Sequence, residues 1–194
     1  MKKKKVLHIV ESFGSGVFSF LTDLVNSTDD EFEITIAYGV RNETLENFKE
    51  YFSNRVRFIE VKNFTRNISL TKDMKAFFEV KKIIKEVNPD VIHLHSSKAG
   101  FIGRFAANGR KVKMLYNPHG FSFFMKNSSK IKRLLYWGFE KIGAIRKCTI
   151  VGCSNGEYKE ALKLSKNSIC INNGINIESL EKVTQKFEDL CLHV

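Results

Sequence analysis

The segment Val112–Phe121, VKMLYNPHGF, decides how the rest of the chain is interpreted. Its apolar half, Val112 to Tyr116, is typical of a buried strand, and Pro118 ends the run because proline has no N–H to donate to a neighbouring strand. Gly120 lets the backbone turn where a side chain would obstruct it. We therefore expect His119 to project from the carboxyl end of a strand, either as a site residue or as a loop histidine bonded to a nearby carbonyl.

Strands and helices alternate over the rest of the sequence. Seven strands are expected, at Lys5–Val10, Phe32–Tyr38, Val56–Val61, Asp90–His95, Val112–Tyr116, Thr149–Cys153 and Ser168–Ile171. Six helices are expected, at about Val17–Asn26, Glu43–Phe52, Thr71–Val87, Ser97–Ala107, Ser129–Arg146 and Ser154–Leu164. This order predicts an α/β fold with a doubly wound, mostly parallel, seven-stranded Rossmann-like sheet. Ligands bind such sheets at the carboxyl ends of the strands, which is where His119 falls.

The composition of the 194 residues fits one large domain. A hydrophobic content of 43% with two prolines argues against disorder. Residues 1–176 are expected to form the Rossmann-like domain, and residues 177–194 a polar helical tail. The apolar runs are too short to cross a membrane and no signal-peptide segment follows Lys2–Lys5, which predicts a cytoplasmic protein. The four cysteines form no CxxC pair and no histidine lies at zinc-ligand spacing, so no metal site is predicted.

The net charge of +11, from 32 basic and 21 acidic residues, predicts a positive field that attracts phosphates. Such phosphates belong to nucleotide sugars, to anionic lipid headgroups or to nucleic acid. The alternative for most individual lysines is a solvated basic surface. No nucleic-acid motif or base-stacking aromatic array accompanies the charge, so no specific nucleic-acid partner is expected.

The loop Gly14-Ser15-Gly16 begins like a dinucleotide-binding fingerprint. Ser19 replaces the third glycine, however, and Tyr38–Arg41 supplies no acidic residue at the end of the second strand, so a nicotinamide cofactor is not expected. The backbone N–H groups of this loop, at a helix N-terminus, suit an anion or a hydroxylated acceptor. The alternative is a turn that only requires glycine.

Two histidines alternate along the fourth strand, His93 and His95, so both side chains point to one face. His93 is expected beneath a helix, whereas His95 is nearer the ligand edge and is expected to line the site. A zinc site on this strand would need further ligands that the neighbouring sequence does not supply. Ser97 and Lys98 then open a helix, where the helix dipole and the lysine favour phosphate, or where the serine is a simple cap.

The helix expected at Ser129–Arg146 carries two kinds of apolar side chain. One stripe is predicted to be its core face: Ile131, Leu134, Leu135, Ile142 and Ile145. Tyr136 and Trp137 lie off that stripe, close to Arg133 and several lysines. Because aromatic rings between cations suit the interface of an anionic membrane, Arg133, Tyr136 and Trp137 are expected to contact lipid. The alternative is that they cover a neighbouring domain or a loop.

Four motifs together resemble the N-terminal, acceptor-binding half of the family-4 glycosyltransferases, enzymes of the GT-B fold found in capsular and exopolysaccharide synthesis. They are Asp90–Arg104 (DVIHLHSSKAGFIGR), Pro118–Phe121 (PHGF), Cys153–Asn155 (CSN) and Asn173–Asn176 (NGIN). The resemblance implies a retaining enzyme that moves a sugar from a UDP- or GDP-linked donor to a lipid-linked or other saccharide acceptor. It also implies no catalytic metal and no tightly bound cofactor.

The resemblance assigns roles to individual residues. It implies that His119 is catalytic and contacts the transferred sugar near the reacting carbon, and that Gly14, Ser15 and Gly16 lie beside the donor diphosphate and the acceptor. The substrate-binding site is expected to be completed by His95, Ser97, Lys98, Gly120 and Phe121. For a lipid-linked acceptor, a peripheral position at the inner face of the plasma membrane is expected.

The sequence departs from the family pattern near its end. Asn176 stands where the family has an acid, and Glu181 and Glu188 are wrongly placed for the paired-glutamate motif of the donor domain. With so little chain after Asn176, we expect a need for a donor domain, in cis or in trans, and no turnover by this chain alone. An excised domain, a truncated gene product and a subunit of a split enzyme all fit. A different class also fits: a non-catalytic basic module that binds a membrane or a partner protein.

Overall fold

The computed structural model describes residues 2–42, 44–125 and 128–173, so the expected tail at 177–194 and the positions of Asn176, Glu181 and Glu188 lie outside the described residues. The strands are β1 (Lys4–Val10), β2 (Phe32–Tyr38), β3 (Arg57–Glu60), β4 (Val91–His95), β5 (Lys113–Asn117), β6 (Thr149–Gly152) and β7 (Ser168–Cys170). The helices are α1 (Ser15–Asn26), α2 (Leu70–Val87), α3 (Ser97–Ala106), α4 (Lys130–Ala144) and α5 (Asn155–Leu164), with short 3-10 helices η1 (Phe48–Tyr51) and η2 (Ser122–Phe124).

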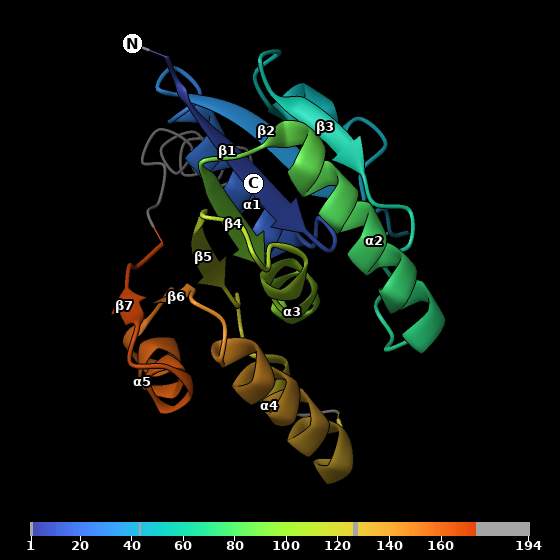
Figure 1. Ribbon diagram of the computed structural model, residues 1–194, viewed down its shortest axis with the longest axis vertical. Coiled ribbons are helices and arrows are strands. Elements are labelled where there is room, and N and C mark those ends of the chain that lie inside the picture. Colours follow the sequence, from blue (N-terminus) through green and yellow to red (C-terminus); the bar gives the residue numbers. More distant parts are fainter. Residues whose placement is uncertain (1, 43, 126–127, 174–194) are drawn as a thin grey trace, which may run out of the picture.

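The seven strands form one sheet in the order β3-β2-β1-β4-β5-β6-β7, and every described pair is parallel. Strands β2 and β3 follow one another on one side of β1. The chain then returns to the other side of β1, where β4 to β7 follow in order toward the opposite edge of the sheet (Figure 1). The predicted doubly wound α/β fold is therefore confirmed. The order reverses between β1 and β4, whose ends pair at Val10 and His95.

Helices cover both faces of the sheet (Figure 1). On one face Leu21 of α1 joins Ile36 of β2 in a buried cluster, and on the other Ile84 of α2 joins Ile9 of β1. Helix α2 begins at Leu70, slightly earlier than predicted. Its buried residues recur at helical spacing along one face: Ala76, Val80, Ile83, Ile84 and Val87.

Helix α3 lies close to the sheet because two of its residues have no side chain. A Cβ on Gly100 would lie 2.4 Å from the ring of Tyr116, and a Cβ on Gly103 would lie 2.3 Å from a methyl group of Leu94. Any larger residue would push the helix away. The two glycines thus allow α3 to pack closely against β4 and β5.

The helix predicted at Glu43–Phe52 is wrong. The described part of this segment forms turns and the 3-10 helix η1. The Oγ1 of Thr44 accepts a hydrogen bond from the N–H of Arg41, which is the local side-chain bonding that competes with helix formation. Phe48 is buried in a cluster of aromatic rings and fixes the segment against the sheet.

The core face predicted for α4 is also wrong. All five residues of the predicted stripe are exposed, by 48% to 80%: Ile131, Leu134, Leu135, Ile142 and Ile145. The buried residues of α4 are Glu140 and Gly143. The helix therefore turns its apolar stripe away from the domain.

Polar groups decide which face of α4 is buried. Arg104 of α3, which is fully buried, donates through Nη2 to Glu140 at 3.0 Å, and the Tyr116 hydroxyl donates to the second carboxylate oxygen at 2.6 Å. A Cβ on Gly143 would come within 2.4 Å of the guanidinium. Because a buried charge must be paired, these contacts hold Glu140 inward, and α4 lies beside α3 at the lower end of the molecule (Figure 1).

Candidate functional site

Loops that follow β1, β5 and β6 meet at the carboxyl edge of the sheet. They surround a pocket of about 810 Å³, here called the histidine pocket, whose lining includes Gly14, Gly16, His119, Gly120, Phe121, Cys153, Ser154 and Glu157. The pocket lies beside the point where the strand order reverses, which is the usual ligand site of such sheets.

The loop that carries His119 has an uncommon backbone conformation. His119 and Gly120 have φ angles of 52° and 91°, and the first of these is unusual for a residue with a side chain. The carboxylate of Glu157 holds the loop, because it accepts the N–H of Gly120 at 2.7 Å and the N–H of Cys153 at 2.6 Å. One acidic side chain of α5 thus ties together two of the loops that form the pocket.

Behind the pocket, histidines from three strands or strand ends lie in contact. His8 Nδ1 is 3.1 Å from His95 Nε2, and His95 Nδ1 is 3.0 Å from His119 Nε2. His93 is buried and its Nε2 lies 2.7 Å from Oδ1 of Asn117. His95 has no exposed surface and lines neither pocket described here, so its contact with the site runs through His119.

Burial keeps these histidines neutral. It lowers the pKa of His93 and that of His119 to about 4, and it lowers the pKa values of His8 and His95 well below the ordinary value. A neutral imidazole has one N–H and one lone pair. At pH 7 His119 therefore offers the pocket a hydrogen-bond donor or acceptor rather than a positive charge, which suits a sugar hydroxyl better than a phosphate.

His8 is the residue of this cluster that the sequence did not point to. It pairs in register with His93 because β1 and β4 are neighbours, and the doubly wound order is the signal that could have found it. The ligand nitrogens of His8, His93 and His95 lie within 4.8 Å of one another. A third imidazole, which the sequence next to His93 and His95 does not supply, is thus provided by the neighbouring strand β1.

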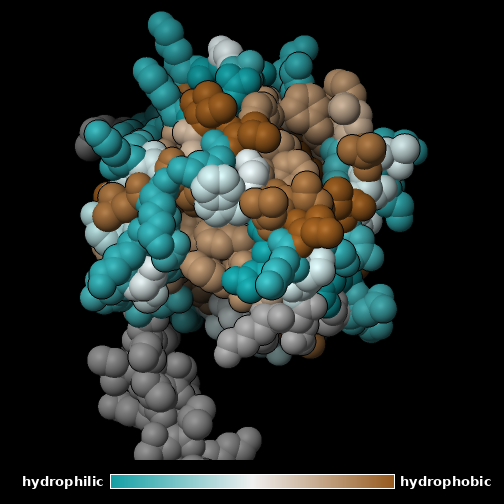
Figure 2. Space-filling model, turned by 90° about the horizontal axis from the view of Figure 1, so that it is seen from below, coloured by the Kyte–Doolittle hydropathy of each residue, from teal (hydrophilic) through white to brown (hydrophobic). Residues whose placement is uncertain are grey.

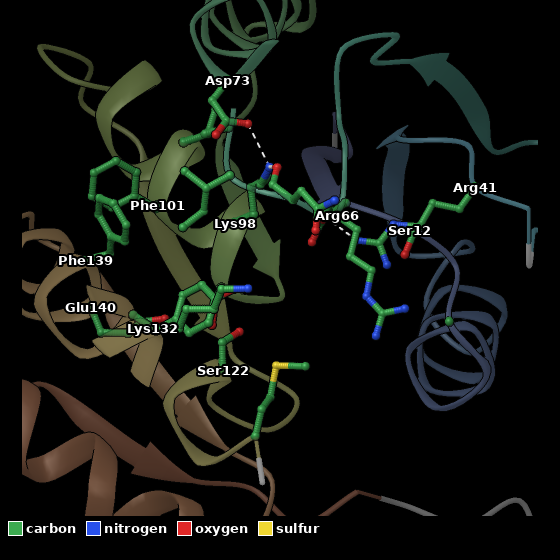
Figure 3. Close-up of a pocket in the computed structure, with 18 of the residues that line it drawn as sticks. Ser12, Arg41, Arg66, Asp73, Lys98, Phe101, Ser122, Lys132, Phe139 and Glu140 are labelled. Atoms are coloured by element: carbon green, nitrogen blue, oxygen red, sulfur yellow. Dashed lines mark hydrogen bonds and ion pairs between the residues drawn. The ribbon is translucent and has the colours of Figure 1, made fainter. Parts of the chain in front are cut away.

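A second and larger hollow, here called the groove, has a volume of about 1160 Å³ (Figure 3). Its apolar side is formed mainly by helices α2, α3 and α4, through Met74, Phe77, Phe101, Ile102, Phe105, Tyr136 and Phe139. Phe101 and Phe139 pack edge to face with their ring centroids 5.2 Å apart. Gly14 lines both the groove and the histidine pocket, so the two sites adjoin.

Four cationic side chains are among the other residues that line the groove. Lys98 donates to Asp73 at 2.7 Å, and Arg41 is paired with Glu11. In the part of the chain that the structure describes, Arg66 and Lys132 have no acidic partner within ion-pair distance. Figure 3 shows Arg66 and Arg41 on the opposite side of the groove from Phe101 and Phe139. The two arginines therefore lie across the groove from these rings, whereas Lys132 comes from α4, the helix that also carries Phe139.

The structure separates the predicted site residues into three groups. Gly14, Gly16, His119, Gly120 and Phe121 line the histidine pocket, although Phe121 is only 2% exposed and stacks on Phe123. Ser97 and Lys98 line the groove, and Ser15 is the first residue of α1. His95 lies behind His119.

The residues predicted to contact a membrane are also divided. Trp137 is 42% exposed, with the Nζ of Lys141 5.3 Å from its ring. Tyr136 is half-buried in the groove, and Arg133 donates to the carbonyl of Phe123 at 2.8 Å. Over the described residues, no helix has both the length and the apolar character needed to span a bilayer.

The fold defines a Rossmann-like domain whose histidine pocket lies at the carboxyl ends of parallel strands. Comparison with known protein families identifies the family. The sequence model of Glycosyltransferase Family 4 matches residues 14–179, and the chain belongs to that family.

Two relatives are similar in sequence, and a solved structure shares the fold. The chain is 33% identical over 186 residues to an uncharacterized 41.2 kDa protein in the cps region of Klebsiella pneumoniae, covering 92% of this chain and 49% of the relative. It is 32% identical over 147 residues to the UDP-Gal:alpha-D-GlcNAc-diphosphoundecaprenol alpha-1,3-galactosyltransferase of Escherichia coli, covering 71% and 36%. The sucrose-phosphate synthase structure from Thermosynechococcus elongatus shares the fold, with a TM-score of 0.67 at 13% identity over 91% of this chain and 49% of the synthase. The chain thus spans half or less of the relatives that it matches.

Proposed function

We propose that residues 1–176 form the acceptor-binding domain of a retaining glycosyltransferase that acts on a lipid-linked saccharide in surface polysaccharide synthesis. The main observation behind the proposal is that the apolar groove and the polar histidine pocket meet at Gly14, which lines both. A lipid-linked sugar has matching parts: an apolar chain, a phosphate group and a sugar hydroxyl. The family, and a relative whose name specifies a GlcNAc-diphosphoundecaprenol acceptor, support this choice.

The groove suits the lipid and phosphate portions of the acceptor. Its apolar side offers aromatic rings and Met74 to a hydrocarbon chain, whose burial is favourable by roughly 0.8 kcal/mol per CH₂ group. Arg66 and Lys132, which lack acidic partners among the described residues, can pair with phosphate. Lys98 contributes positive charge but already bonds to Asp73, so we assign it a smaller share of the affinity.

The histidine pocket suits the reacting sugar. A neutral His119 can exchange a hydrogen bond with a hydroxyl, and the Glu157 carboxylate holds its loop in place. The Gly14 to Gly16 segment, at the N-terminus of α1, presents backbone N–H groups that favour the donor diphosphate. We assign the nucleotide sugar mainly to a second domain, in cis or in trans, which is consistent with the greater length of the relatives.

Calorimetric titration with farnesyl-diphosphate-linked GlcNAc, a short soluble acceptor analogue, tests this proposal. Met74→Ser should weaken binding about fivefold to tenfold, because it removes an exposed apolar side chain that the ligand would cover, at a cost of about 1 to 1.5 kcal/mol. Phe78→Ser is the matched control, since Phe78 is as exposed as Met74 on the same helix but does not line the groove.

A second pair of variants tests the phosphate contact. Lys132→Ala should weaken binding severalfold and reduce its dependence on salt, whereas Lys130→Ala should change neither, because Lys130 does not line the groove. Absence of binding by the wild-type chain, or equal losses in the groove variants and their controls, would contradict the proposal.

Binding to an anionic membrane is a second candidate function, and the exposed stripe of α4 favours it. Five aliphatic side chains of α4 and its C-terminal end face away from the domain, flanked by Lys130, Lys132 and Lys147. Figure 2, seen from below, shows apolar side chains in several groups on one face, with hydrophilic ones between them. Such a surface suits the headgroup region at the inner face of the plasma membrane, where it would bring the groove to a lipid-linked acceptor.

Sedimentation with vesicles that contain phosphatidylglycerol tests the membrane contact. Leu134→Ser should weaken binding about tenfold, because Leu134 is 68% exposed on the stripe. Leu162→Ser on α5, where the leucine is 42% exposed, is the control. If both variants bind as the wild type does, the stripe does not contact the membrane. A non-catalytic role would then mean binding to a partner protein.

A further inference from the structure

Three histidines form a continuous hydrogen-bonded row that ends in the histidine pocket. The row runs from His8 through His95 to His119, with nitrogen to nitrogen distances of 3.1 Å and 3.0 Å. The rings of adjacent members are nearly parallel, at 25° and 18°, with centroids 5.4 Å and 5.3 Å apart. His8 and His95 are buried, so water does not interrupt the row.

The chemistry of neutral imidazole restricts where the protons of this row can lie. Each ring has one N–H and one lone pair, and a hydrogen bond between two ring nitrogens needs one of each. His95 uses both nitrogens, so it donates through one and accepts through the other. If its proton is on Nδ1, then His8 and His119 carry theirs on Nδ1 as well; if it is on Nε2, all three carry the proton on Nε2.

We propose that His8 and His95 are positioning residues that fix the tautomer of His119, so that the proton arrangement of the buried row decides whether Nδ1 of His119 donates or accepts in the pocket. The coupling of tautomers rests on the geometry alone. The consequence for a sugar hydroxyl at Nδ1 rests on the proposed function.

The surroundings of His119 hold its ring in the orientation that the row requires. Its left-handed backbone places the ring over His95, and the ring of Phe20 packs edge to face against it at 4.9 Å. The second ring nitrogen, Nδ1, lies outside the row and makes a long contact of 4.0 Å with Sγ of Cys153, which also lines the pocket. Nδ1 is therefore the atom through which the row meets a ligand.

A metal ion held by His8, His93 and His95 is the competing explanation for this cluster. A metal ion would take a lone pair from each of the three rings, so a ring nitrogen that binds it could not also take part in a hydrogen bond of the row. His95 already has partners at both nitrogens and His93 is bonded to Asn117. The hydrogen-bonded row accounts for these contacts without any further group.

Two-bond ¹H–¹⁵N correlation spectra of the ¹⁵N-histidine-labelled chain test the proposal, because they distinguish Nδ1–H from Nε2–H in each ring. We expect His8, His95 and His119 to carry the proton on the same nitrogen in the wild-type chain. Opposite tautomers at His8 and His119 would overturn the proposal. One equivalent of zinc or another transition metal in the purified protein would overturn it too.

A pair of variants sharpens the test. In His8→Leu, a proton on His95 Nε2 would be buried without a partner, so His95 should carry its proton on Nδ1. His119 should then also carry its proton on Nδ1. We expect the ratio of the Nδ1–H to the Nε2–H tautomer of His119 to rise about tenfold or more. His93→Leu is the matched control, since His93 is buried in the same cluster but bonds to Asn117 outside the row. No shift at His119 in His8→Leu, or an equal shift in both variants, would contradict the coupling. If either variant fails to fold, the wild-type spectra still decide, and none of these outcomes depends on acceptor binding.

Discussion

Helices α2 and α4 have similar apolar stripes in sequence and opposite fates in the structure. The stripe of α2 is buried against the sheet, where Ile84 has no exposed surface, whereas the stripe of α4 faces outward, with Ile131 74% exposed. The difference lies in their polar residues: α4 carries Glu140, which is paired with Arg104 inside the domain. The stripe of α2 is fixed by apolar contacts and the orientation of α4 by a buried ion pair. An amphipathic pattern thus identifies a helix but does not say which face is covered.

Acidification should have the largest effect on stability. It acts on the buried neutral histidines, which become charged when the chain unfolds at low pH, rather than on the buried ion pair of α4. The pKa values of the buried histidines lie below that of an unfolded histidine, near 6.5, so the unfolded chain binds more protons as the pH falls. Stability is complete above about pH 7.5 and is lost toward pH 4. We expect His8, His93 and His95 together to cost about 6 kcal/mol between pH 7.5 and 5.0, with a smaller contribution from the less buried His119, measured by urea unfolding.

His93→Gln is the control for this effect, because it should remove the contribution of one histidine, about 2 kcal/mol of the loss over this pH range. A free energy of unfolding that stays constant over this range would show that these histidines are charged or exposed.

Removal of the Arg104 guanidinium should have the next largest effect. Arg104→Ala leaves Glu140 buried without its charged partner, so we expect a loss of about 3 to 5 kcal/mol in urea unfolding. The exposed pair of Arg57 and Glu86 is the comparison, and Arg57→Ala should cost less than about 1 kcal/mol. Equal losses would mean that the ion pair does not anchor α4.

Truncation of one aliphatic residue on each helix compares the stripes directly. Ile84→Ala on α2 should cost about 2 to 5 kcal/mol, because it leaves a cavity in the core. Leu134→Ala on α4 should stay within about 0.5 kcal/mol of the wild type, because its side chain is 68% exposed. A large loss for Leu134→Ala would place the α4 stripe in the core, as the sequence pattern predicted.

Two glycines of α4 give the smallest and most local comparison. A Cβ on Gly143 meets the Arg104 guanidinium at 2.4 Å, so Gly143→Ala should cost about 1 to 3 kcal/mol. No atom lies within 4 Å of a Cβ on Gly138, and Gly138→Ala should stabilise the chain by about 0.5 to 1 kcal/mol through helix propensity. Thermal unfolding of both variants measures the difference. If both are stabilising, α4 and α3 do not pack as closely as described.

The fold followed from the sequence because strands such as Phe32–Tyr38 show local patterns, and alternation with helices fixes a parallel sheet. The position of His119 just after a strand could be predicted for the same reason, since Pro118 and Gly120 mark a strand end. The orientation of α4 could not follow, because Arg104 and Glu140 are separated by 36 residues and meet only after folding. The place of His8 required the strand order, and the groove required three helices to come together.

The most direct test of the proposed acceptor site is crosslinking with a short prenyl diphosphate-linked GlcNAc that carries a diazirine at the end of its lipid, followed by peptide mapping. We expect label on the groove segments Met74–Phe77 and Phe101–Phe105, with protection by unlabelled analogue. Label spread over exposed apolar residues elsewhere, such as Leu162 and Ile169, with none on the groove, would contradict an acceptor-binding role for this domain.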